Sequence, residues 1–74
     1  MTSPTERQVI EYINDARIGQ GLSINAFATL AGLSARTVGA KLAGERPTRV
    51  TDLYRFAVAL GTTPAQIYTV LEDA

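Results

Sequence analysis

The 74-residue chain contains no cysteine and no histidine. Without cysteine it can form neither a disulfide nor a thiolate metal site. Without histidine it lacks the commonest zinc ligand and the commonest general base. The sequence also lacks carboxylates paired at a catalytic spacing and a glycine-rich phosphate loop. We therefore expect a protein that is not an enzyme and that needs no metal or cofactor.

Long apolar runs are missing as well. No run approaches the roughly 18 residues that a membrane-spanning helix needs. The N-terminus lacks the basic flank and apolar segment of a signal peptide. Apolar residues still make up 46% of the chain, which is more than a disordered chain shows. We expect one globular domain over residues 1–74, located in the cytoplasm.

An excess of one charge is absent, because seven basic residues balance seven acidic ones. The charges are nevertheless unevenly distributed. Residues 32–55 have a balance of +3 and the remainder has a balance of −3. The basic residues of this segment are Arg36, Lys41, Arg46, Arg49 and Arg55. Such a layout lets one face of a neutral protein meet an anion such as nucleic acid.

Residues 23–44 hold two short helical patterns joined by a glycine turn. Ser23 and Ser34 can each cap a helix, since a serine oxygen accepts from the N–H groups of a first turn. Gly32 lies between them and can adopt the positive φ that a tight turn requires. The predicted helices span residues 24–31 and 35–43. Two helices joined in this way form a helix-turn-helix.

Three further helices are predicted around this unit. The first starts with Ser3 as the cap, Pro4 in the first helical position and Glu6 completing a capping box, and it ends at the glycines at positions 19 and 21. Another spans residues 50–60, with either Thr48 or Thr51 as its cap. The apolar stripe of that helix comprises Val50, Leu53, Phe56, Ala57 and Leu60.

The last helix is predicted from a second capping box, residues 63–66, with Pro64 at its first position. Its apolar side comprises Ile67, Tyr68, Val70 and Leu71. Short helices with short connections and no alternating strand pattern predict an all-α fold, a compact five-helix domain.

Three positions carry a family resemblance: Ala28, Gly32 and Val38 have the spacing of the lambda-repressor-like helix-turn-helix family, which includes the Cro and xenobiotic-response-element types. The chain also resembles this family in Gly44-Glu45-Arg46-Pro47 and in the run from Leu53 to Pro64. The resemblance covers about residues 6–71. It implies a five-helix DNA-binding domain whose second helix crosses the phosphate backbone and whose third helix enters the major groove.

Two residues depart from the family pattern. Ile24 stands where the family often has a glutamine that contacts phosphate, and Lys41 stands where it usually has an apolar residue. We expect Leu42 to take over the core contact and Lys41 to be free to reach a phosphate.

Burial of Val38 and Leu42 turns the opposite side of helix 35–43 outward. Arg36 is the best candidate for direct readout, since its guanidinium can bond bidentately to guanine. Ala35 and Ala40 can meet a thymine methyl group. Gly39 either allows close approach of the backbone to DNA or is simply tolerated.

Phosphate contacts are expected from three places. The first is the start of helix 24–31, where unpaired N–H groups favour an anion, and the others are helix 35–43 and the loop after it. The candidates are Ser23, Asn25, Ser34, Thr37, Lys41, Arg46, Thr48 and Arg49. Arg7, Arg17 and Arg55 are expected to be surface or ion-pair residues.

The predicted function is that of a sequence-specific regulator that binds double-stranded DNA as a homodimer, similar to a phage or prophage repressor or to Cro. Tyr68 and Leu71 of the last helix are candidates for the dimer surface. The alternative is a protein-interaction module on the same fold, such as an antitoxin, which would bind its partner through the C-terminal helix. An exposed apolar patch on that helix would favour this alternative.

Overall fold

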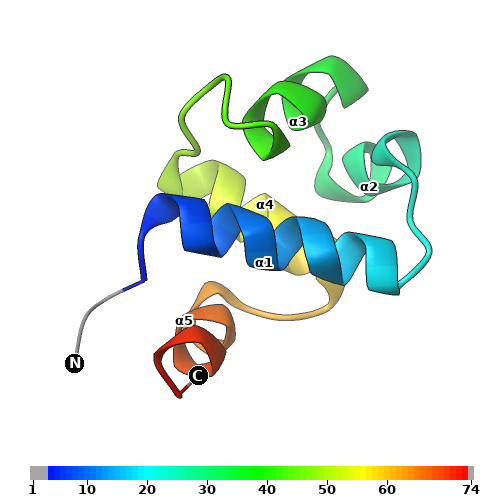
Figure 1. The fold of residues 1–74 in the computed structure, drawn as a ribbon. Coiled ribbons are helices and arrows are strands. Elements are labelled where there is room, and N and C mark those ends of the chain that lie inside the picture. The colour runs from blue at the N-terminus through cyan, green and yellow to red at the C-terminus, as the bar shows by residue number, and fades with distance from the viewer. Residues whose placement is uncertain (1–3, 74) are drawn as a thin grey trace.

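The computed structural model describes residues 4–73, which form five α-helices and no strand. The helices are α1 (Glu6–Gly19), α2 (Ile24–Ala31), α3 (Ala35–Leu42), α4 (Val50–Leu60) and α5 (Pro64–Asp73). The predicted all-α fold of five helices is confirmed for these residues. Figure 1 shows α2 and α3 on one side of α1 and α5 on the other, with α4 behind α1.

The start of α1 differs from the prediction. Pro4 precedes the helix, and the cap is Thr5, whose hydroxyl accepts from the N–H of Gln8 at 3.2 Å. The Gln8 side chain accepts from the N–H of Thr5 at 2.8 Å, which completes a capping box. The helix therefore starts two residues later than predicted, and Ser3 lies outside the described residues. Glu6 is not part of this box and is available for another contact.

The helix-turn-helix has the predicted caps and turn. The hydroxyl of Ser23 accepts from the N–H of Ala26, and that of Ser34 accepts from the N–H of Thr37, each at 3.1 Å. Gly32 ends α2 at φ +73°, in the left-handed region that a residue with a Cβ enters only at a cost. The turn between the two helices is thus set by three local residues.

The start of α4 differs in two ways. Its cap is Arg49 rather than Thr48 or Thr51, and the N–H of Arg49 donates to the carboxylate of Asp52 at 2.9 Å. Val50, predicted to belong to the buried stripe, is 84% exposed. The other side chains of that stripe are buried or half-buried, so the error concerns only the first turn.

Helix α5 begins at Pro64 as predicted. The N–H of Gln66 donates to the hydroxyl of Thr63, whereas the Gln66 side chain bonds the hydroxyl of Thr62, so only half of the predicted capping box is present. Ile67 is fully buried, but Tyr68 and Val70 are exposed.

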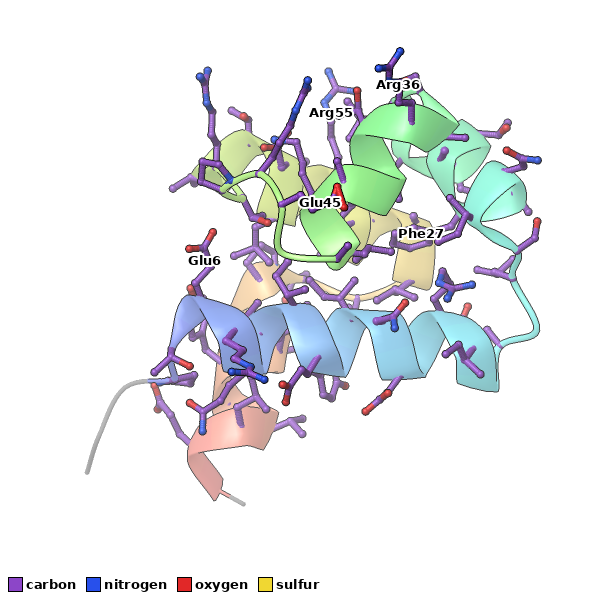
Figure 2. All side chains as sticks on the ribbon, turned by 45° about the horizontal axis from the view of Figure 1, so that its top comes forward. Glu6, Phe27, Arg36, Glu45 and Arg55 are labelled. Carbon is purple, nitrogen blue, oxygen red and sulfur yellow. The ribbon has the colours of Figure 1, made fainter. Side chains whose placement is uncertain are left out.

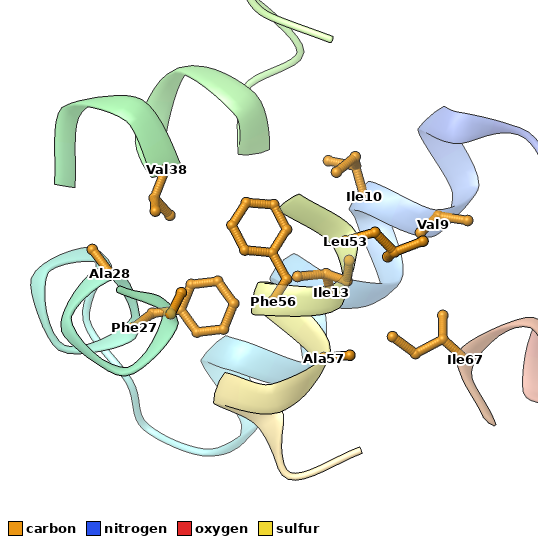
Figure 3. Close-up of a cluster of buried hydrophobic side chains, with 11 residues drawn as sticks. Val9, Ile10, Ile13, Phe27, Ala28, Val38, Leu53, Phe56, Ala57 and Ile67 are labelled. Carbon is orange, nitrogen blue, oxygen red and sulfur yellow. The ribbon is translucent and has the colours of Figure 1, made fainter. Parts of the chain in front are cut away.

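The core is centred on two phenylalanines, shown in Figure 3. Phe27 of α2 and Phe56 of α4 are fully buried, with ring centroids 5.5 Å apart. Val38 of α3 and Ile13 of α1 are also fully buried in the same cluster. This contact fixes the helix-turn-helix on the other helices, since α2 and α3 reach the core through Phe27 and Val38.

Two glycine substitutions test how the turn is built. Gly32→Ala should lower the free energy of unfolding by about 1–2 kcal/mol, because alanine is strained at positive φ. A Cβ there would also lie 2.8 Å from a guanidinium nitrogen of Arg55, which must then shift. Gly39→Ala should instead stabilise the fold by up to about 1 kcal/mol, because a Cβ at this position of α3 meets open space. Denaturant unfolding measures both, and equal stabilities for the two variants would contradict this account.

Candidate nucleic-acid interface

Arg36 is the most prominent side chain of α3. It is exposed in the first turn of this helix and points away from the body of the protein in Figure 2. Two residues further on, Val38 is fully buried, which anchors the opposite side of α3 in the core. Arg36 therefore lies on a fixed helix with its guanidinium in solvent.

The small residues of α3 that were predicted to face DNA beside Arg36 are less exposed than expected. Ala35, Gly39 and Ala40 are all half-buried, and Ala35 packs against the core. Only part of each can meet a ligand. In the described part of the chain, no atom outside the backbone of α3 and the two neighbouring residues lies within 4 Å of a Cβ placed at Gly39, so packing there does not require a glycine.

The N-terminal turns of α2 and α3 present polar groups. Ser23 and Asn25 are exposed at the start of α2, and Ser34 is exposed at the start of α3. The hydroxyls of Ser34 and Thr37 lie 2.8 Å apart and bond each other. Backbone N–H groups at such ends attract anions, which suits phosphate.

The expectation that Lys41 is free to reach a phosphate is wrong. The residue is only 8% exposed, and its ammonium group lies 2.6 Å from the carboxylate of Asp52. It also donates to the backbone oxygen of Pro47 at 3.2 Å. Lys41 takes an inward position, and Leu42 is half-buried and packs against the core as expected.

The buried ion pair changes the acidity of Asp52. Burial raises the pKa of this carboxyl, but hydrogen bonds from Lys41 and from the N–H of Arg49, together with the charges of both residues, lower the pKa by more than burial raises it. The net result is a pKa below the ordinary value of 3.8. Asp52 therefore stays ionised at neutral pH and holds the start of α4 to the end of α3.

The α3–α4 loop (residues 43–49) carries the other two basic residues among the predicted phosphate contacts. Arg46 and Arg49 are exposed. Thr48 is half-buried, its N–H donates to the carboxylate of Glu6 at 2.6 Å, and its hydroxyl is buried. The loop thus offers two arginines on a backbone that is bonded to other helices.

Comparison with known families decides what this arrangement is. The sequence pattern of the helix-turn-helix family matches residues 13–67, which is well over half of the chain. The chain belongs to the lambda-repressor-like helix-turn-helix family. Comparisons with curated proteins and with solved structures gave no match.

Membership of the helix-turn-helix family makes this a regulatory domain that binds double-stranded DNA. Such domains bind DNA with the second helix of the unit, which here is α3. No helix within residues 4–73 is long and apolar enough to cross a membrane.

Sequence reasoning missed two contacts that hold elements of this helix-turn-helix domain together, those of Glu6 and of Asp52. Asp52 could have been found, since a lysine in an inward position of α3 demands a buried partner. Arg55 donates to the backbone oxygen of Ala31 at 3.3 Å, near the end of α2. The Glu6 contact had no sequence signal, because it joins residues 42 positions apart.

An apolar groove lies between α2 and α4 of the domain. Leu30, Val50, Tyr54 and Val58 line it, and each of these side chains is more than half exposed. Arg55 is the charged residue of its lining. Exposed apolar side chains therefore occur on α2 and α4 as well as on α5.

The lowered pKa of Asp52 predicts acid sensitivity. Near pH 4 the unfolded chain binds more protons at Asp52 than the folded chain, so this residue adds stability above that pH and loses its contribution as the pH falls. Asp52→Asn should cost about 2 kcal/mol at pH 7. Denaturant unfolding between about pH 2 and 7 should show the two proteins converging in stability below about pH 4. A constant difference across this range would contradict the assignment.

Proposed function

We propose that this protein is a sequence-specific transcriptional regulator of the repressor or Cro type, from a phage or prophage, that occupies an operator through the major groove. The observation that carries this proposal is Arg36, exposed at the N-terminal turn of a helix that Val38 anchors in the core. An operator-bound domain would block access of RNA polymerase to the promoter. As such a regulator, the single domain acts in the cytoplasm, at the nucleoid.

Base readout rests mainly on Arg36, with its guanidinium bonded to a guanine in the major groove. The exposed parts of Ala35 and Ala40 supply apolar contact to a thymine methyl group. Gly39 allows the backbone of α3 to approach the bases, which gives the glycine a reason that packing within the chain does not. This set has one long polar side chain, so we expect a narrow base code.

We expect phosphate contacts from exposed or half-exposed groups of α2, α3 and their flanking loops. We assign them to Ser23, Asn25, Ser34, Thr37, Arg46 and Arg49. Lys41 is excluded because its ammonium is buried against Asp52. Thr48 is also left out, since its N–H is bonded to Glu6 and its hydroxyl is buried.

A homodimer on DNA follows from the same proposal, with half-sites about 34–36 Å apart along the duplex. Tyr68 supports a dimer surface on α5, since it is an exposed aromatic side chain there. Leu71 is half-buried against the core and contributes less than predicted.

Replacing Arg36 tests the readout. Duplexes that bind the wild type are first selected from a random-sequence pool, and affinities are then measured for the best site and its single-base variants. Arg36→Ala should weaken binding to the best site by about 1–3 kcal/mol and relax the preference at one base pair. Arg7→Ala removes the same charge from the exposed Arg7–Glu11 pair of α1 and should keep the preference.

Two results would count against this function. A uniform loss of affinity across all sites would make Arg36 a phosphate contact. Absence of salt-dependent binding of the wild type to any duplex would exclude the DNA-binding function, because phosphate contacts release counterions.

Protein recognition is a second candidate function, as in an antitoxin. The apolar groove between α2 and α4 favours it, since surface patches of this kind mark interaction sites. Tyr54→Glu places a charge in the groove without touching α3. Under this function, a partner protein that co-purifies at 1:1 with the wild type is lost with Tyr54→Glu, whereas DNA affinity is unchanged. A chain that purifies alone and binds DNA tightly argues against this candidate.

A further inference from the structure

The α3–α4 loop is held by its backbone at three consecutive residues. The oxygen of Pro47 accepts from the ammonium of Lys41 at 3.2 Å, and the N–H of Thr48 donates to the carboxylate of Glu6 at 2.6 Å. The N–H of Arg49 donates to the carboxylate of Asp52 at 2.9 Å. Each bond comes from a charged side chain on a different helix.

These bonds constrain a segment that has no regular structure of its own. Residues 47–49 belong to no helix or turn, and Pro47 has no N–H to offer. Hydrogen bonds to charged groups are stronger than those between neutral groups. The three charged side chains therefore replace the hydrogen bonds that a helix would give this stretch, and they link it to α3, α1 and α4.

We infer that Glu6, Lys41 and Asp52 are positioning residues for DNA binding: they fix the loop so that Arg46 and Arg49 are presented to phosphate. This inference rests on the proposed DNA-binding function. Two of these residues, Glu6 and Asp52, are acidic. Their negative charge by itself would oppose binding to DNA, yet the inference gives them a favourable role in it.

Removing either carboxylate tests the inference through the direction in which DNA affinity changes. If only their charge mattered, removing either carboxylate would strengthen DNA binding, because a repelling charge disappears. If they position the loop, removal weakens binding, because the loop must then be ordered when DNA binds. The two accounts predict opposite changes in affinity.

Glu6 gives the sharper experiment, because it is exposed and outside the core. Glu6→Ala should lower the affinity for the selected duplex about fivefold. The slope of log affinity against log salt should fall by about 1 as a phosphate contact is lost. Glu6→Gln removes the same charge but keeps an oxygen that can accept from Thr48, so it should bind like the wild type or more tightly.

Glu45, an acidic residue of the α3–α4 loop itself, supplies a matched control for Glu6. It is exposed, and no bond from its carboxylate to residues 47–49 is present in the described part of the chain. Figure 2 shows Glu6 and Glu45 on different elements, α1 and the region after α3. Glu45→Ala removes one negative charge close to the arginines and should leave binding unchanged or strengthen it.

Asp52→Asn should also weaken DNA binding, and circular dichroism must show it folded at the temperature of the measurement. Hydrogen exchange gives a readout without DNA: the amide of Thr48 should exchange faster in Glu6→Ala than in Glu6→Gln or the wild type.

The outcomes separate the inference from the function on which it rests. If the wild type binds DNA and Glu6→Ala binds equally well or better, the inference is wrong and the function stands. The inference also fails, with the function intact, if Glu6→Gln loses as much affinity as Glu6→Ala. If the wild type binds no duplex in a salt-dependent way, the proposed function and the inference are both overturned.

Discussion

The contact between Phe27 and Phe56 is the interaction on which the rest of the structure depends. A chain of this length buries only about 60% of its unfolded surface, so few side chains can form its core. These two rings are its largest fully buried side chains, and they join α2 to α4. That contact fixes α2 against α4, and α3 follows α2 through a turn of three residues. The orientation of the DNA-facing helix is therefore decided in the interior.

Much of the fold could be predicted from the sequence because its signals are local. Ser23 and Ser34 cap the helices that follow them, and Gly32 ends α2, each through contacts within a few residues. The spacing of Val38 correctly predicts its place in the core. In the recognition helix, the exposed position of Arg36 then follows from helical geometry.

The errors arise where contacts between distant residues compete with local preference. Lys41 has a long charged side chain that local reasoning places in solvent, but Asp52, 11 positions away, draws it inward. The same carboxylate bonds the N–H of Arg49 and so replaces a threonine cap at the start of α4. Val50 fits the apolar stripe by spacing, yet it lies in the first turn, where α4 projects beyond the core. One unrecognised ion pair thus accounts for two of these three errors.

The charged residues that hold the α3–α4 loop bond backbone atoms of residues 47–49, and every residue type other than proline offers the same backbone atoms. The sequence of this loop can therefore change during evolution without loss of these bonds. Within residues 4–73, the side chains of Arg46 and Arg49 make none of the hydrogen bonds that hold this path. Under the proposed function, substitutions at these two positions can change the contacts with DNA while these hydrogen bonds to the backbone are preserved. Related domains could acquire different phosphate contacts one residue at a time, provided that the charged residues on α1, α3 and α4 are retained.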